Sequence, residues 1–158
     1  RTVFSALANS GIAAKRLELE ITEKILLLDN EATLKTLHGL RDLGVRIAMD
    51  DFGTGYSSLS YLRSFPFDKL KIDRSFVSDF IEGGSDGAIV SAVASMSKSL
   101  GIETTAEGVE TEAQLEMVTT AGYTQMQGYL FSQPVSGAEI SRKYFSGKDP
   151  DQVMALPA

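Results

Sequence analysis

Short apolar-rich runs alternate with helical patterns along almost the whole chain, and this alternation limits the possible folds more than any other feature. The runs begin roughly 20 to 30 residues apart. Strands that alternate with helices in this way are typical of βαβ units and a parallel sheet. The sequence therefore predicts an α/β fold with five βα units. The expected strands are RLELEIT (16–22), VRIAMDD (45–51), DKLKID (68–73), IETTAEG (102–108) and YTQMQGYLF (123–131).

Helical patterns fill the intervals between the expected strands. Leucines recur every three residues from Leu34 to Leu43, and Thr111 stands where it can cap a helix. Gly101 and Gly122 each follow such a segment, as glycine does at helix C-termini. We expect one domain of residues 1–146 and a tail of residues 147–158. The expected helices lie near residues 3–9, 31–43, 75–81, 86–100, 112–121 and 136–145.

The composition excludes several classes of function. The 158 residues carry a net charge of −6 and form no basic stripe, which argues against a nucleic-acid polymer as partner. The absence of cysteine rules out disulfides and thiolate metal sites and fits a reducing compartment. No apolar run approaches the ~20 residues of a membrane span. We expect a cytoplasmic domain; any membrane anchor of the parent protein would precede Arg1.

Polar residues stand at the end of every expected strand. In parallel α/β folds the C-terminal ends of the strands face one side of the sheet, and active sites are built there. The sequence therefore predicts a single polar rim rather than scattered surface charges. The residues of this rim are Glu20, Asp50, Asp51, Lys71, Asp73, Glu107, Glu110 and Gln127.

Two adjacent carboxylates, Asp50 and Asp51, end the second expected strand and precede a Gly-x-Gly sequence. Successive residues in a strand point to opposite faces, so both acids reach one site only if the strand bends. Gly53 and Gly55 permit a bend, because glycine adopts positive φ without a Cβ penalty. Converging carboxylates without cysteine suit hard divalent cations such as Mg²⁺ or Mn²⁺. Two such ions bridged by one carboxylate suit phosphoester hydrolysis.

Structural roles are the alternative for each of these residues taken alone. The aspartate pair could cap a helix and form a turn, and Lys71 could be a single salt-bridge partner. We expect Glu18 to be a solvated surface charge whose side chain points away from that of Glu20. We assign no role to His38, which we expect at the surface. Because all the rim residues fall at strand ends, a shared site is favoured over independent structural roles.

Five motifs, in the same order and at similar spacing, resemble those of the EAL domain, a family of bacterial phosphodiesterases that hydrolyse cyclic di-GMP to linear pGpG. The resemblance extends from Arg1 to about Phe145. It implies an incomplete modified TIM (β/α) barrel with five βα units visible, and two divalent metal ions, Mg²⁺ or Mn²⁺, as cofactors. The motifs are LELEITE, MDDFGTGYSSLSYL, KIDRSFV, TTAEGVET and QGYLFSQP.

The resemblance also implies a role for each residue of the rim. Lys71 and Glu107 resemble catalytic residues, and Lys71 would contact the attacking water or the scissile phosphate. Glu23 resembles the glutamate that anchors the DFGTGYSS loop, which in the family links metal binding to dimerisation. The implied metal ligands are Glu20, Asp50, Asp51 and Glu107, with Asp50 bridging both ions. The implied substrate-binding residues are Asp73, Glu110, Gln127 and Pro134.

The chain departs from the family pattern on its N-terminal side. The strand with the Glu-x-Leu motif and the next strand, with its metal-binding Asn, have no counterpart here. We therefore expect these residues to be inactive alone, since two first-metal ligands are missing. The resemblance implies that the complete domain binds cyclic di-GMP as a homodimer. It also implies N-terminal GGDEF or sensor domains in the parent protein.

Two other functions fit part of the pattern. A catalytically degenerate EAL relative would bind cyclic di-GMP without hydrolysing it. Such relatives usually lose metal ligands, and every ligand that can be checked here is present. A phospho-accepting receiver domain also uses paired aspartates and a lysine, but there the lysine lies on a much later strand. Lys71 is only 20 residues past Asp51, on the next strand, so a phosphodiesterase is favoured.

Overall fold

Five strands form one parallel sheet in the sequential order β1-β2-β3-β4-β5 in the computed structural model of the chain. The structure describes residues 2–22, 24–25, 30–54, 62, 65–79 and 86–145. Parallel neighbours require a crossover connection between consecutive strands. The predicted α/β fold with five βα units is therefore confirmed. The strands are β1 (Glu18–Thr22), β2 (Arg46–Phe52), β3 (Lys69–Ile72), β4 (Glu103–Ala106) and β5 (Gln125–Met126).

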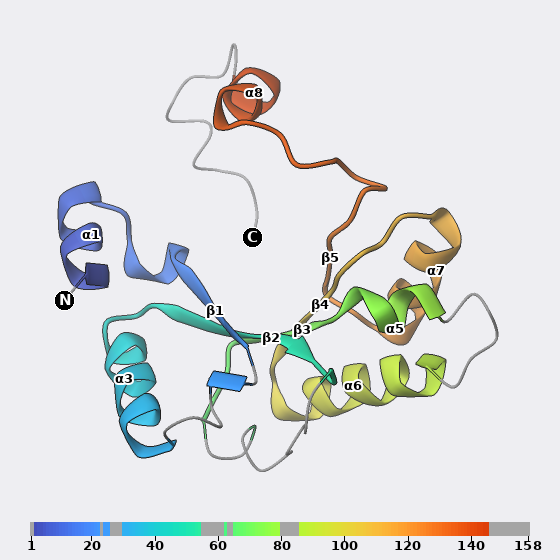
Figure 1. Cartoon of the computed structure of the whole chain (residues 1–158), viewed down its shortest axis with the longest axis horizontal. Helices are drawn as coiled ribbons and strands as arrows, with labels where there is room; N and C mark the ends of the chain where they lie inside the picture. The colour runs from blue at the N-terminus through green and yellow to red at the C-terminus, as the bar shows by residue number, and fades with distance from the viewer. Residues whose placement is uncertain are drawn as a thin grey trace.

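Helices cover one face of this sheet, whereas α8 lies apart from the sheet at the end of an extended segment (Figure 1). α3 packs on β2 and α6 packs on β4, and α5, α6 and α7 contact one another. The helices are α1 (Thr2–Ser10), α3 (Asn30–Asp42), α5 (Arg74–Asp79), α6 (Asp86–Leu100), α7 (Glu112–Ala121) and α8 (Gly137–Ile140). A 3₁₀ turn, η1 (Ala14–Arg16), precedes β1, and a π-helical turn, η3 (Ser141–Phe145), follows α8.

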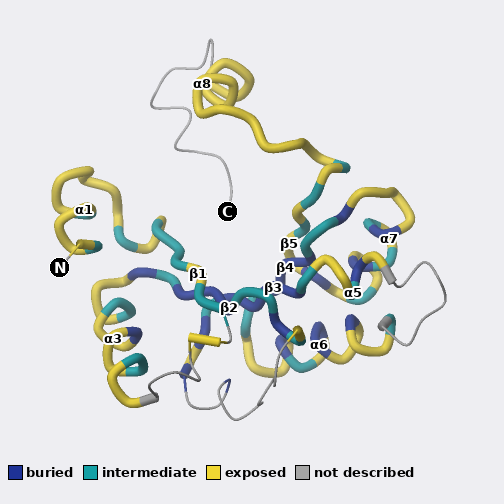
Figure 2. The backbone as a smooth tube through the Cα atoms, viewed as in Figure 1, coloured by how far each residue is buried: buried dark blue, intermediate teal, exposed yellow. Residues whose placement is uncertain are grey.

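The apolar core lies between the sheet and the helices. Ile47 and Met49 of β2, with Leu70 and Ile72 of β3, are almost completely buried there. Val90 of α6 packs into the same cluster. Figure 2 shows this burial concentrated in the strands and on the inward sides of the helices. Burial of apolar surface against the helices thus holds one face of each strand in place.

The opposite face of the sheet, which we call the inner face, is polar. Side chains alternate between the two faces along a strand, so Arg46, Ala48 and Asp50 of β2 point away from the core that Ile47 and Met49 enter. Ala48 is fully buried yet lies outside the apolar core cluster, which agrees with its place on the inner face. The chemistry of this protein is therefore expected on the inner face.

The sheet is not closed into a barrel. Among the described strands, β1 pairs only with β2, and β5 pairs only with β4. The expected strand over 123–131 is reduced to Gln125–Met126. Past its end, the chain bonds instead to the loop after β4: Val109 N–H donates to Gln127 O, and Leu130 N–H donates to Val109 O, both at 3.0 Å. These two bonds tie the ends of β4 and β5 together.

α7 begins and ends as its sequence predicts. The Thr111 hydroxyl accepts a hydrogen bond from the Gln114 backbone N–H, and the Gln114 side chain accepts one from the Thr111 N–H, which makes a capping box. Gly122 ends the helix with φ at 94°. In α6, Val90 and Val93 are buried, whereas Ile89 and Leu100 are 39% and 50% exposed.

Other predicted segments differ from the structure at their ends. The helix expected over 75–81 begins one residue earlier, at Arg74, and its C-terminal end falls outside the described residues. The expected tail, 147–158, also lies outside them. Among the residues that the structure describes, no helix has both the length and the apolar character to cross a membrane.

Gly128 makes the junction between the ends of β4 and β5 possible. A Cβ at this position would overlap the backbone N, C and O of Val109. The overlapped atoms are main-chain atoms that hydrogen-bond to the same segment, so they have little freedom to move away. A side chain at position 128 would push apart the two strand ends that carry Glu107 and Gln127.

We expect Gly128→Ala to lower the free energy of unfolding by about 1–3 kcal/mol, because the added methyl overpacks this junction. Gly39→Ala is the matched control. Gly39 lies within α3, where a Cβ meets no other atom, and alanine should stabilise the helix by about 0.5–1 kcal/mol. Urea unfolding measures both variants. A Gly128→Ala protein as stable as the unsubstituted one would contradict the close packing.

Candidate active site

A β-bulge at the end of β2 brings the two adjacent aspartates into one site. The pairing of β2 with β3 shifts register between Met49 and Phe52. Within this stretch Asp51 has a φ of 54°, a left-handed conformation that aspartate tolerates better than most residues. Gly53 follows with φ at 95°. The predicted bend is therefore present, and Asp51 itself makes it together with Gly53; Gly55 lies outside the described residues.

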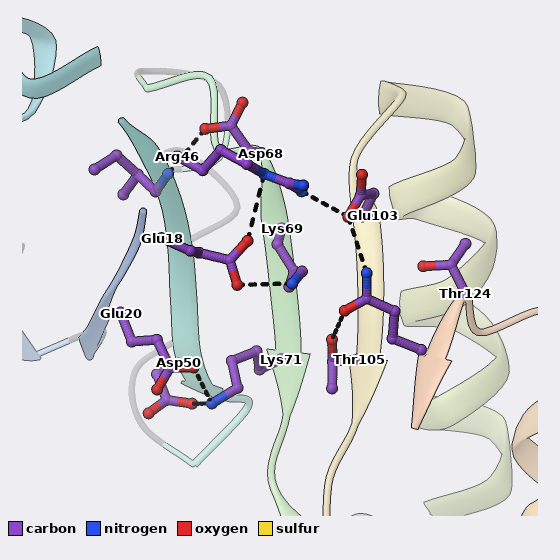
Figure 3. A network of polar contacts seen from close by, with 12 residues as sticks. Glu18, Glu20, Arg46, Asp50, Asp68, Lys69, Lys71, Glu103, Thr105 and Thr124 are labelled. Atoms are coloured by element: carbon purple, nitrogen blue, oxygen red, sulfur yellow. Dashed lines mark hydrogen bonds and ion pairs between the residues drawn. The ribbon is translucent and has the colours of Figure 1, made fainter. Parts of the chain in front are cut away.

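Lys71 stands at the centre of this site on β3. Its Nζ lies 2.7 Å from Glu20 Oε1, 2.7 Å from Glu107 Oε1 and 3.0 Å from Asp50 Oδ1. The side chain of Lys71 is only 6% exposed. Figure 3 shows Lys71 directed across the inner face toward Glu20 and Asp50. β1, β2 and the turn directly after β4 thus each supply one acid to the same ammonium group.

Burial and charge act in opposite directions on Lys71. Burial lowers the pKa of Lys71, but the hydrogen bonds from its ammonium group to Glu107, Glu20 and Asp50 outweigh burial and raise that pKa well above its usual value. Burial also raises the pKa of Glu107, and the contact with Lys71 only partly offsets it, since Asp50 and Glu20 repel the ionised form. The site therefore holds its lysine charged and carries more negative charge than one lysine neutralises.

Three carboxylates of this site are close enough to share a cation. One oxygen each from Asp50, Asp51 and Glu107 lies within 4.8 Å of the others. Asp50 Oδ1 is buried, and its ion-pair partner among the described residues is the Lys71 ammonium group at 3.0 Å. Oxygen-only donors with an incompletely satisfied buried carboxylate fit a hard divalent cation. Glu20 adjoins the group through Lys71 and is the most exposed of the four acids.

A small pocket of about 220 Å³ adjoins the acids at the C-terminal ends of β3, β4 and β5. It is lined by three of the four residues assigned to the substrate, Asp73, Glu110 and Gln127, together with Glu107. The fourth, Pro134, lines a neighbouring pocket of about 360 Å³ that shares Gln127 with the first. The structure therefore gathers three of these residues directly and places Pro134 one pocket further along the same surface.

Asp73 is held in this pocket by the start of α5. Its Oδ1 accepts hydrogen bonds from the Ser75 backbone N–H at 3.0 Å and from the Ser75 hydroxyl at 2.6 Å. Burial acts to raise the pKa of Asp73, but these bonds dominate and lower it. Asp73 is therefore an ionised acceptor with a defined orientation.

Glu18 contradicts the prediction that it is a solvated charge pointing away from Glu20. The two residues are separated by two positions, and strand side chains have a period of two, so both lie on the inner face (Figure 3). Glu18 Oε1 lies 2.7 Å from Lys69 Nζ, and Glu18 Oε2 lies 3.4 Å from Arg46 Nε. The prediction was wrong because it treated residues i and i+2 as if they alternated.

Sequence reasoning missed the whole polar row to which Glu18 belongs. Arg46 also binds Glu103, with 2.6 Å between Arg46 Nη2 and Glu103 Oε2. Gln125 Nε2 donates to the same Glu103 oxygen at 3.2 Å. The row Glu18–Arg46–Lys69–Glu103 was detectable in principle, because each member precedes a rim residue by two or four positions on the same face of its strand.

Glu23, the expected loop anchor, lies outside the described residues, as do residues 55–61 of the loop. His38 is exposed on α3, as expected, and its ring meets that of Phe65 edge-on at 5.1 Å between centroids.

The sequence and the fold both match known proteins. The EAL domain profile matches residues 1–134. The cyclic di-GMP phosphodiesterase NbdA of Pseudomonas aeruginosa is 47% identical over 138 residues, which cover 87% of this chain and 18% of NbdA. The chain spans no more than about a fifth of the length of the curated relatives that it matches first.

Solved structures agree with the sequence comparison. The solved structure of the MucR phosphodiesterase in complex with c-di-GMP superposes with a TM-score of 0.83 at 42% identity, covering 87% of this chain and 56% of the chain in that structure. BlrP1 of Klebsiella pneumoniae, in a complex with manganese and cyclic di-GMP, superposes with a TM-score of 0.78 at 36% identity, covering 84% of this chain and 34% of BlrP1. The five-stranded sheet thus has the arrangement found in these proteins.

Because Asp51 has a positive φ in the bulge, we expect two substitutions that both remove its carboxylate to differ in their effect on the free energy of unfolding. Asparagine tolerates the left-handed conformation, so Asp51→Asn should keep the stability of the unsubstituted protein within about 0.5 kcal/mol. Valine is β-branched, so Asp51→Val should lose about 1–3 kcal/mol. Urea unfolding compares the pair. Equal stability of the two variants would show that Asp51 does not hold this strained conformation in solution.

Proposed function

The chain belongs to the EAL domain family, and on that premise we propose that it forms part of a phosphodiesterase that hydrolyses cyclic di-GMP to linear pGpG. The observation that carries the proposal is the convergence of Asp50, Asp51 and Glu107 beside Lys71 at the C-terminal ends of parallel strands. This is where α/β folds place their active sites.

Two divalent ions, Mg²⁺ or Mn²⁺, are the proposed cofactors, and Glu20, Asp50, Asp51 and Glu107 are the proposed ligands from this chain. When bound, such ions stabilise charge on phosphoryl oxygens and lower the pKa of water. The paired aspartates support this assignment, because the bulge turns both carboxylates toward Glu107. The manganese complex of BlrP1, at 36% identity, supports a metal site in this family.

Lys71 is proposed to orient the attacking water or to neutralise charge on the scissile phosphate. Its ammonium group is buried, charged and already directed at the acids. The acids already hold this cation in place, so it can stabilise an anionic transition state without any rearrangement of the site. Glu107 Oε1 lies 2.7 Å from Lys71 Nζ, and one Glu107 oxygen lies within 4.8 Å of an oxygen of each aspartate, which supports its roles as ligand and as orienting group for Lys71.

The pocket of Asp73, Glu110 and Gln127 is proposed to hold the rest of the substrate. Arg74 lines the same pocket and contributes a positive charge that suits a phosphate. The oriented carboxylate of Asp73 and the amide of Gln127 offer hydrogen bonds to base or sugar groups. Pro134, in the neighbouring pocket, would contact a more distant part of the ligand.

The parent protein is proposed to be a bacterial cytoplasmic protein in which this domain acts with N-terminal GGDEF or sensor domains. The small share of each curated relative that this chain covers supports such a multidomain context. A homodimer of the complete domain is proposed as the functional unit.

Asp50→Asn tests the metal site in the protein at its full natural length. We expect at least a hundredfold loss of cyclic di-GMP hydrolysis at saturating Mn²⁺, because the carboxylate that would hold the metal is removed. Glu116→Gln, which neutralises an exposed acid of α7, is the control and should hydrolyse at the unsubstituted rate. Comparable rates for Asp50→Asn and the unsubstituted protein would refute the metal assignment. Binding of cyclic di-GMP without hydrolysis by the unsubstituted protein would establish the degenerate alternative.

Residues 1–158 expressed alone should be inactive, weakly metal-binding and prone to self-association. β1 and β5 each have an unpaired edge among the described strands, and exposed edges pair with other chains. The proposed first metal site also lacks two of the ligands that the family pattern supplies from upstream strands. Sedimentation, thermal unfolding and hydrolysis, compared with the full-length protein, test this expectation. A monomer that unfolds cooperatively and matches the full-length rate would overturn it.

A further inference from the structure

The charges on the inner face form two rows with different balances. The lower row, Glu18–Arg46–Lys69–Glu103, lies nearer the N-terminal ends of the strands and is drawn toward the top of Figure 3; it contains two acids and two bases and is neutral within itself. The upper row contains four acids and one base and keeps three negative charges uncompensated; its members are Glu20, Asp50, Asp51, Glu107 and Lys71. The excess that suits divalent cations is thus confined to the upper row.

Strand register does not explain which lysine binds which glutamate. Glu20 of β1, Ala48 of β2 and Lys69 of β3 lie level with one another across the sheet. Ala48 has only a methyl group, so side chains from β1 and β3 can meet above it. By register, Lys69 is opposite Glu20, yet its Nζ binds Glu18 at 2.7 Å.

Each lysine instead points toward the N-terminal ends of the strands and binds the preceding inner-face residue of β1. Lys69 binds Glu18, and Lys71 binds Glu20, each with 2.7 Å between the lysine Nζ and the glutamate Oε1 (Figure 3). Glu18 is held at both oxygens, by Lys69 and by Arg46, and the Lys69 side chain is only 10% exposed. The ion pair with Glu18 therefore keeps the Lys69 ammonium group in the lower row, away from the acids of the upper row.

From this geometry we infer that Glu18 is a positioning residue that keeps Lys69 out of the metal site. Without the Glu18 carboxylate, the lower row carries a net positive charge, and the nearest level acid for Lys69 is Glu20. The ammonium group of Lys69 then moves into the proposed metal site or close to it, where Lys71 already neutralises part of the negative charge. In either position it repels the metal ion. Glu18 thus controls metal affinity without being a ligand. This inference rests on the proposed metal site.

Mn²⁺ binding, measured by isothermal titration calorimetry on the full-length protein, tests the inference without relying on activity. Glu18→Gln should weaken binding by about tenfold or more, since an added unit charge a few ångströms away is strongly repulsive to a divalent ion. Lys69→Met should bind within about twofold of the unsubstituted protein. The double variant Glu18→Gln with Lys69→Met should recover most of the lost affinity, because the displaced ammonium group is gone.

Glu103→Gln is the matched charge control. It removes an acid from the same lower row but leaves the Glu18–Lys69 pair intact, because Glu103 binds Arg46 and Gln125 instead. Its Mn²⁺ affinity should fall by less than about threefold. A loss equal to that of Glu18→Gln would show a general charge effect rather than release of Lys69 and would overturn the inference.

The remaining outcomes separate this inference from the proposed function. A Glu18→Gln protein that binds Mn²⁺ like the unsubstituted one, or a double variant as weak as Glu18→Gln, overturns the role of Glu18 while the metal site stands. An unsubstituted protein that binds no Mn²⁺ overturns both. Thermal unfolding of each metal-free variant reports whether the fold is kept. If Glu18→Gln alone does not fold, weak Mn²⁺ binding by a folded double variant overturns the inference.

Discussion

The two-faced character of the parallel strands is the constraint on which the rest of this structure depends. Ile47, Met49, Leu70 and Ile72 bury one face of β2 and β3 against helices. Because strand side chains alternate, the residues between them must occupy the inner face. On that face the side chain of Lys71 is only 6% exposed, and a buried cation of this kind requires several acids nearby.

Charge balance then divides the inner face into a structural part and a chemical part. The lower row satisfies its own charges through Glu18, Arg46, Lys69 and Glu103. The upper row does not, and its burial raises the pKa of Glu107 despite the contact with Lys71. An excess of carboxylate over ammonium is what a hard cation can relieve. Membership of the EAL domain family agrees with a site of this kind.

Local backbone geometry adds what regular strands cannot provide. An unbroken strand would send Asp50 and Asp51 to opposite faces, and the bulge with Asp51 at positive φ turns them to one site. Gly128 acts similarly on a second edge of the site, because its missing Cβ lets the chain after β5 bond to Val109. A strained backbone conformation and a close backbone approach thus both lie beside the acids.

The sequence by itself determined the α/β class, the capped ends of α7 and the strand-end acids, since periodicity, Thr111 and Gly122 act over a few residues. It also implied that Glu18 and Glu20 share a face, although that implication was misread. Only the tertiary structure decided which lysine pairs with which glutamate. Glu18 and Lys69 are 51 residues apart and meet across β2, although the strand register places Lys69 level with Glu20, so their pairing depends on how side chains of three strands pack together.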